Sequence, residues 1–172
     1  MSQLPKAYDE LIGPLIEVAR GILEQGDSLQ PVAFVGNFRS RQIVPVLFDA
    51  SDSQAKERSV FTIKQTALAV EADFVALVME AWALPKEKMA QFEAIIEEYG
   101  SIGASPYRVD SLSITIETQH GVWVAQSPLK PKKGTKGGRT FSRPDFQLAS
   151  DVEGRFVGLL SQRADRPAPG LH

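Results

Sequence analysis

The sequence predicts an α+β fold: a mostly antiparallel sheet with two to three helices packed mainly on one face. The predicted order is α-β-β-α-β-α-β-β, followed by a further β-β pair. Three observations predict it: helical and strand periodicities follow one another along the chain, residues 111–118 alternate between apolar and polar, and only one crossover allows parallel pairing. The 172 residues fit one domain over 1–162, with a mobile basic loop at 128–144 and a flexible tail at 163–172.

Three segments have the spacing of amphipathic helices. The first, 5–25, contains Pro14, which predicts either a kink or a helix that begins at this proline. The second follows residue 54 and ends near Asp73. The third begins at Pro85 and ends at Gly100, two residue types that favour a helix start and a helix stop.

Strands are predicted between and after these helices. The segment 74–83 is apolar on both faces, as expected for a central strand that is covered on both sides. In 111–118 the apolar residues share one face, and the polar residues, including Glu117, share a face that we expect to be wet. Residues 145–161 form either a terminal hairpin or a strand followed by a helix. The other predicted strands are 33–37, 42–48, which Pro45 places at a sheet edge or bulge, and 121–127.

Composition excludes several kinds of chemistry. The chain has no cysteine, which excludes disulfides, thiolate nucleophiles, iron–sulfur clusters and Cys-ligated zinc. Its two histidines are His120, in a predicted hairpin turn, and His172, the last residue; no Gly-x-Ser-x-Gly elbow accompanies them. We therefore expect no metal and no cofactor. The chain also lacks a long apolar run and a secretory signal pattern, so we expect no membrane association and a cytoplasmic location.

One segment is strongly basic although the chain has a net charge of −2. Residues 118–144 contain no acid and carry a charge of +6, which leaves −8 on the remainder. We expect this loop either to bind an acidic protein or a nucleic acid, or to be simply solvated. Deleting 129–142 is expected to leave the thermal midpoint nearly unchanged. The candidate binding residues of the loop are Lys130, Lys132, Lys133, Lys136 and Arg139, and Arg143 completes the basic set.

A carboxylate and a tryptophan interrupt the apolar segment 74–83. Glu80 and Trp82 share one strand face, because side chains alternate along a strand. A buried carboxylate needs a partner, and Arg108, just before the next strand, is the nearest candidate. The pair is either a structural ion pair or a ligand-binding site that includes Trp82. Asp110 lies two residues beyond Arg108 and is, with Glu80, a candidate acid or base.

Short motifs carry a resemblance to a known group of proteins. The tripeptide EAW at 80–82 and the stretch SPYRVDSL at 105–112 resemble an uncharacterised family of bacterial and phage or plasmid proteins with an EAW … PxRx[DE] pattern. The resemblance implies that Glu80, Trp82 and Arg108 form one recurring cluster and assigns no activity to it. The element order also resembles profilin-type and roadblock-type modules, which mostly mediate interactions.

The function that these observations favour is non-catalytic binding, through the basic loop or the Glu80, Trp82 and Arg108 cluster, with a homodimer as one form. The alternative is an enzyme that acts on an anionic small molecule, with Glu80 and Asp110 as acid and base and Arg108 as the group that orients the substrate. A third interpretation is a structural subunit of a larger assembly.

Overall fold

The computed structural model describes residues 3–149 and 158–160. It confirms the α+β class and the order of elements. No helix within those ranges combines the length and the hydrophobicity that crossing a bilayer requires. The elements are α1 (Lys6–Glu24), β1 (Val32–Asn37), β2 (Gln42–Leu47), α2 (Ser53–Ala69), β3 (Phe74–Ala83), the 3-10 helix η1 (Lys86–Gln91), α3 (Phe92–Tyr99), β4 (Val109–Thr118), β5 (Gly121–Pro128), β6 (Lys130–Pro131), β7 (Arg139–Thr140) and β8 (Gln147–Ala149).

The main sheet has six strands in the order β2-β1-β3-β4-β5-β8, and every neighbouring pair is antiparallel. β2 and β3 run in the same direction, but β1 lies between them, so the crossover through α2 makes no parallel pair. Pro45 lies in β2 at the sheet edge, as predicted. Of the predicted terminal pair, β8 is one strand; most of the segment predicted to follow it, and the tail 163–172, lie outside the described residues.

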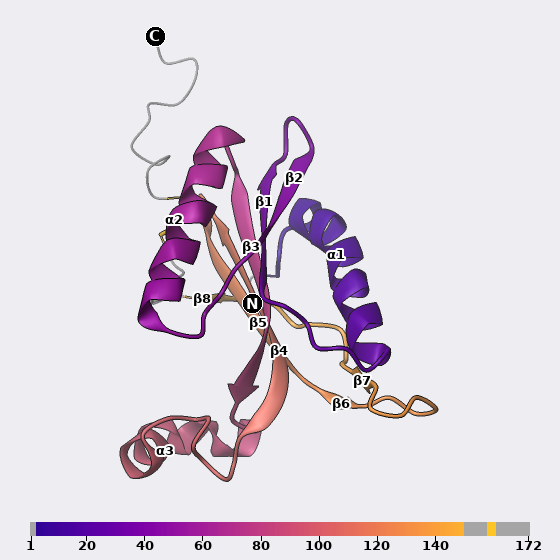
Figure 1. The fold of residues 1–172 in the computed structure, drawn as a ribbon, viewed down its shortest axis with the longest axis vertical. Helices are drawn as coiled ribbons and strands as arrows, with labels where there is room; N and C mark the ends of the chain where they lie inside the picture. The colour runs from indigo at the N-terminus through magenta and orange to yellow at the C-terminus, as the bar shows by residue number, and fades with distance from the viewer. Residues whose placement is uncertain (1–2, 150–157, 161–172) are drawn as a thin grey trace.

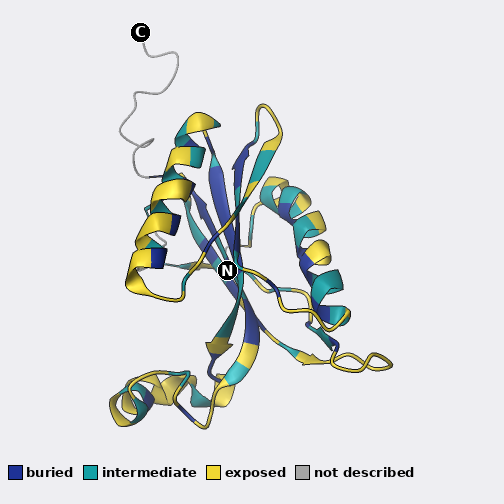
Figure 2. Ribbon diagram, viewed as in Figure 1, coloured by how far each residue is buried: buried dark blue, intermediate teal, exposed yellow. Residues whose placement is uncertain are grey.

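The helices cover both faces of the sheet, not mainly one face as the sequence predicted. Phe74, Ala76 and Val78 of β3 belong to the core on the α1 side, whereas Val75 and Leu77 belong to the core on the α2 side. Figure 1 shows α1 and α2 on opposite sides, and Figure 2 shows the strands between them as the most buried part. A strand with large apolar side chains on both faces needs cover on both sides.

Helix α1 is continuous although Pro14 lies inside it. Its buried residues Ile12, Ile16 and Leu23 recur at helical spacing and pack against the sheet. This burial offsets the backbone hydrogen bond that proline cannot donate. The helix therefore neither stops nor restarts at Pro14, which lies exposed on its surface.

The end of β3 and the start of β4 extend beyond the two covering helices. We call residues 80–111, which these strand ends enclose, the projection; it carries η1 and α3 away from α1 and α2 (Figure 1). A small set of buried side chains, which includes Leu84, Ile95 and Ser105, holds it together. The projection therefore presents its own surface to solvent, separate from the two faces of the sheet.

A long connection runs from β5 to β8, and we call its residues 129–146 the strap. It contains the β6–β7 ribbon, and part of it lies beside the C-terminal end of α1 (Figure 1). The approach is close at Gly138, where an added Cβ would lie 2.5 Å from the carbonyl oxygen of Glu24. Only a residue without a side chain allows the ribbon backbone to lie this near to the helix.

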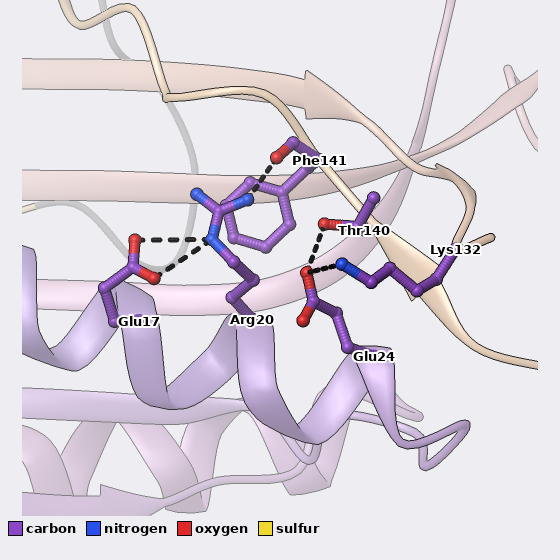
Figure 3. Close-up of polar contacts among 6 residues, drawn as sticks. All are labelled: Glu17, Arg20, Glu24, Lys132, Thr140 and Phe141. Carbon is purple, nitrogen blue, oxygen red and sulfur yellow. Dashed lines mark hydrogen bonds and ion pairs between the residues drawn. The ribbon is translucent and has the colours of Figure 1, made fainter. Parts of the chain in front are cut away.

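Contacts with α1 hold the strap at several points, as Figure 3 shows. Phe141 is buried, the Arg20 guanidinium lies 4.1 Å from the centre of its ring, and an Arg20 N–H also donates to its carbonyl. The Thr140 hydroxyl donates to Glu24 at 2.7 Å, and Lys132 forms an ion pair with the same carboxylate at 3.5 Å. The Thr140 hydrogen bond lowers the pKa of Glu24 most, burial raises it by less, and the charge of Lys132 lowers it further. The basic segment is thus docked on the acidic side of α1.

Candidate functional site

Glu80 lies near the end of β3, at the rim of the core on the α1 side. Its side chain is 26% exposed. Its carboxylate accepts a hydrogen bond from the backbone N–H of Leu29 at 2.8 Å and forms an ion pair with Arg139 of the strap at 2.6 Å. A charged hydrogen bond and a guanidinium partner compensate for removing this carboxylate from bulk water.

The partner of Glu80 is therefore Arg139, and the predicted pairing with Arg108 is wrong. The strand register explains why: Glu80 faces Leu112 across β3 and β4, and Arg108 lies four residues before Leu112. At about 3.3 Å per residue, that separation is about 13 Å along the strand. The Arg108 guanidinium instead lies 5.1 Å from the Trp82 ring and donates to the carbonyl of Gly103 at 2.5 Å.

A depression of about 340 Å³ brings four of the predicted site residues together. It is lined by Glu80, Ala81, Trp82, Asp110 and Arg139. Asp110 faces Trp82 in the register, so the two carboxylates are diagonal neighbours on adjacent strands. Asp110 is exposed, whereas Glu80 is held by its two partners. We call this feature the Glu80 depression; it has two carboxylates, one guanidinium and one indole around a space large enough for a side chain or a small anion.

Two exposed aromatic rings of the projection each carry a cation. Trp82 is 54% exposed and carries Arg108 on its ring, and Tyr107 is 38% exposed and carries the Lys88 ammonium 4.4 Å from its ring centre. Each cation and the aromatic ring beneath it attract each other, and this contact fixes the orientation of the ring. Met89, next to Lys88 in η1, is exposed as well, and we call the side chains of Trp82, Tyr107, Arg108, Lys88 and Met89 the aromatic face of the projection.

The basic residues of the predicted loop divide into two groups. Arg139, Lys132 and Arg143 form ion pairs with Glu80, Glu24 and Asp9. Lys130 donates to Ser142, while Lys133 and Lys136 are exposed at the turn of the ribbon. Much of the +6 charge that the sequence places in this segment is therefore neutralised by the acidic body of the same chain. Within residues 3–149 and 158–160, no three His, Cys, Asp or Glu side chains are placed to share a metal ion.

A second pocket, of about 720 Å³, lies at the opposite end of β3, and the sequence prediction missed it. Its walls come from four segments: the start of α1, the β1–β2 turn, the α2–β3 turn and the β4–β5 turn. The only sequence signal was His120, predicted in a turn. No local pattern joins segments that are far apart in the chain. The lining residues are Tyr8, Asn37, Phe38, Arg39, Glu71, Asp73, Gln119 and His120.

Comparison of the chain with family models, with curated proteins and with solved structures gives no match.

Proposed function

We propose that this chain is a binding protein that holds a polypeptide partner on the aromatic face of the projection. The observation that carries the proposal is the position of Trp82. The preceding residues of its strand, from Phe74 to Val78, are buried in the core, yet Trp82 is 54% exposed beside the Glu80 depression. Tryptophan, tyrosine and arginine are the residues that most often dominate the binding energy of protein interfaces.

The chemistry of the face favours a partner with both apolar and acidic groups. Trp82 and Tyr107 offer exposed rings, while Arg108 and Lys88 place cations on those rings. Such a surface pairs apolar side chains with the rings and carboxylates with the cations. An extended nucleic acid fits less well, because its row of phosphates would run past Glu93, Glu97 and Glu98 on α3, whereas a peptide needs carboxylates only beside Arg108 and Lys88.

Replacing Trp82 with alanine is expected to weaken binding of an acidic aromatic peptide at least tenfold. The probe is a labelled twelve-residue peptide of alternating Glu and Phe, and fluorescence anisotropy measures its dissociation constant. The reason is the loss of a large exposed ring that also carries the Arg108 guanidinium. Arg108→Ala should weaken binding less and reduce its dependence on salt.

Phe61→Ala is the matched control, because Phe61 is an aromatic residue on α2, outside the projection, and is 65% exposed against 54% for Trp82. It is expected to leave the affinity unchanged. Equal losses in the two variants would mean non-specific adhesion and would contradict the proposal. A single-stranded oligonucleotide that binds more tightly than the peptide would contradict the partner class. If the molecular mass of the wild type rises with protein concentration and Trp82→Ala removes this rise, the occupant of the face is a second copy of the chain.

A second candidate function is acid–base catalysis on an anionic small molecule. It is favoured by one observation: Glu80, Asp110 and Arg139 line a single depression. Arg139 would take the orienting role that the sequence assigned to Arg108, and exposed Asp110 would be the group that exchanges protons.

If this function is correct, Asp110→Asn abolishes turnover of carboxylate and phosphate esters in a substrate screen while the unfolding midpoint stays unchanged. Glu80→Gln would reduce both turnover and stability, since Glu80 also binds Leu29 and Arg139. Turnover that survives both substitutions would exclude it.

A further inference from the structure

The aromatic face carries positive charge that carboxylates of its own chain do not neutralise. Lys88 and Arg108 lie over the rings of Tyr107 and Trp82, and neither cation forms an ion pair with a carboxylate of residues 3–149 or 158–160. The strap differs, because three of its basic residues are paired with acids of the same chain. The two cations of the projection are therefore available to carboxylates of a partner.

Trp82 is exposed, yet its ring is held in one place. A Cβ added at Gly103 would lie 2.3 Å from the ring, so the Gly103 backbone lies directly against it. Arg108 donates to the Gly103 carbonyl at 2.5 Å and has its guanidinium 5.1 Å from the ring centre. A ring that is already fixed loses little freedom when a partner packs on it. The aromatic face is thus a surface of defined shape.

Helix α3 of the same projection carries groups of the complementary kind. Ile95 is its buried residue, and Glu93 and Glu97, two positions before and after it, lie about 200° around the helix, on the outward side. Both glutamates are exposed, and neither forms an ion pair within the described part of the chain. Phe92, the first residue of α3, is 42% exposed. Helix α3 therefore offers an apolar ring and two carboxylates, the chemistry that the aromatic face favours.

The aromatic face and α3 lie side by side. Tyr99 at the end of α3 contacts Tyr107 edge to face, with ring centres 6.3 Å apart. Figure 1 shows that the projection holds α3 away from α1 and α2, so a second molecule can approach it. Two complementary surfaces that are neighbours on one molecule can pair with the same two surfaces of a second copy around a two-fold axis. Such pairing forms two identical contacts and closes at two copies.

We propose that the polypeptide held on the aromatic face is α3 of a second copy of this chain, so that two projections pair around a two-fold axis. Glu93 and Glu97 of each copy lie beside Arg108 and Lys88 of the other, and Phe92 packs against the exposed rings. This inference rests on the proposed function and names the partner of the same face. Because the contact joins exposed charges, high salt should weaken it.

Charge reversal tests the pairing in the full chain. Sedimentation over a series of protein concentrations should show the mass of the wild type rising from one chain toward two. Lys88→Glu with Arg108→Glu, or Glu93→Lys with Glu97→Lys, places like charges across both contacts, and each double variant should raise the dimer dissociation constant about tenfold or more. An equimolar mixture of the two double variants should recover the dimer, because both contacts of the mixed dimer again join opposite charges. A mixture that stays at the mass of one chain would overturn the pairing with α3.

Lys56→Glu with Arg58→Glu is the matched control, since it replaces the same two residue types and changes the net charge equally on α2, outside the projection. This variant should dimerise like the wild type. Equal weakening in the control would show that net charge governs association, which would overturn the inference. Unchanged unfolding midpoints verify that all these variants fold.

Gly103→Ala tests the position of the Trp82 ring without a change of charge. The added Cβ would displace the ring, so dimerisation should weaken. Gly13→Ala is its control, because a Cβ at Gly13 meets no atom within 4 Å. Dimerisation that is equally strong in both variants would contradict a contact on this ring.

Competition with the peptide of alternating Glu and Phe separates this inference from the proposed function. Excess peptide should return the wild-type dimer to the mass of one chain. A wild type that stays at that mass at every concentration, while the peptide still binds and depends on Trp82, would overturn this inference and leave the proposed function in place. A chain that neither dimerises nor binds the peptide would overturn both. A dimer that neither the peptide nor Trp82→Ala weakens forms elsewhere and would also overturn the inference.

Discussion

Replacing Phe141 with alanine is expected to lower the free energy of unfolding by about 3–4 kcal/mol, the usual cost of truncating a buried phenylalanine. Phe141 is 2% exposed and belongs to the core on the α1 side, although it lies in a segment that reads as a solvated loop. Urea unfolding of both proteins measures the difference. Limited proteolysis should also cut the variant first between residues 130 and 140, because the strap loses its apolar anchor.

Lys132→Ala is the control for this prediction. Its ion pair with Glu24 is solvent-accessible, and such pairs contribute about 0–1 kcal/mol. Salt at high concentration should likewise weaken the charge contacts and leave the strap in place. If Lys132→Ala or salt releases the strap as readily as Phe141→Ala does, charge pairing and not burial holds it.

The burial of Phe141 changes the expected effect of deleting the basic loop. Composition alone predicts that deleting 129–142 leaves the thermal midpoint nearly unchanged. The deletion removes Phe141 from the core and Arg139 from Glu80, so we now expect it to destabilise the chain. Removing Arg139 leaves the partly buried Glu80 carboxylate with the Leu29 N–H but without its guanidinium partner.

Replacing Glu117 with alanine is the second change with a large expected effect. Glu117 is 8% exposed on β4, and its carboxylate accepts a hydrogen bond from the backbone N–H of Leu159 at 2.9 Å. The backbone N–H groups of Gly158 and Leu160 donate to it as well. Each buried donor left without a partner costs roughly 1–3 kcal/mol, and Leu159 and Leu160 would lose their fixed place beside α2. Urea unfolding measures the loss.

Glu117→Gln removes the titration of this group, and because the amide NH2 of glutamine cannot accept a hydrogen bond, the pH dependence and not the absolute stability reports the charge. Burial raises the pKa of Glu117 above its ordinary value, while the three backbone N–H groups and the charge of Lys64 lower it by less. A raised folded-state pKa contributes stability that is complete below the unfolded pKa and is lost as the pH rises through the folded pKa. The stability of the wild type relative to Glu117→Gln should therefore fall as the pH rises from the ordinary carboxyl pKa through the raised pKa of folded Glu117.

Unfolding free energies of both proteins across that pH range provide the measurement. Glu97→Gln, which alters an exposed carboxylate on α3, should follow the wild-type curve. A wild-type advantage that grows with pH would mean that the backbone donors outweigh burial and would contradict the assigned direction.

Local patterns predicted the elements well. Apolar spacing located the three helical segments and the strands, and Pro45 indicated the sheet edge. The alternation in 111–118 correctly separated Leu112, Ile114 and Ile116 from the polar face, because strand periodicity depends only on the backbone. The polar face was less predictable: Glu117, expected in water, is covered by residues 158–160. Alternation shows which residues share a face but not what packs on it.

The candidate site was predicted in part. Glu80, Trp82 and Asp110 do line one depression, since their positions on two neighbouring strands follow from register. Arg139 replaces Arg108 as the partner of Glu80, and the 720 Å³ pocket had no signal beyond His120. These features combine segments separated by tens of residues, and composition does not show which of several basic residues will meet a given carboxylate.

The sequence by itself determined the helices, the strands and the faces that must be buried, because periodicity and backbone preferences are properties of adjacent residues. Only the tertiary structure decided that both faces of the sheet are covered, that the strap docks on α1, and which charges pair. Those outcomes depend on how distant segments pack against a shared core, where close contact and exclusion of water select one partner among several of the same charge.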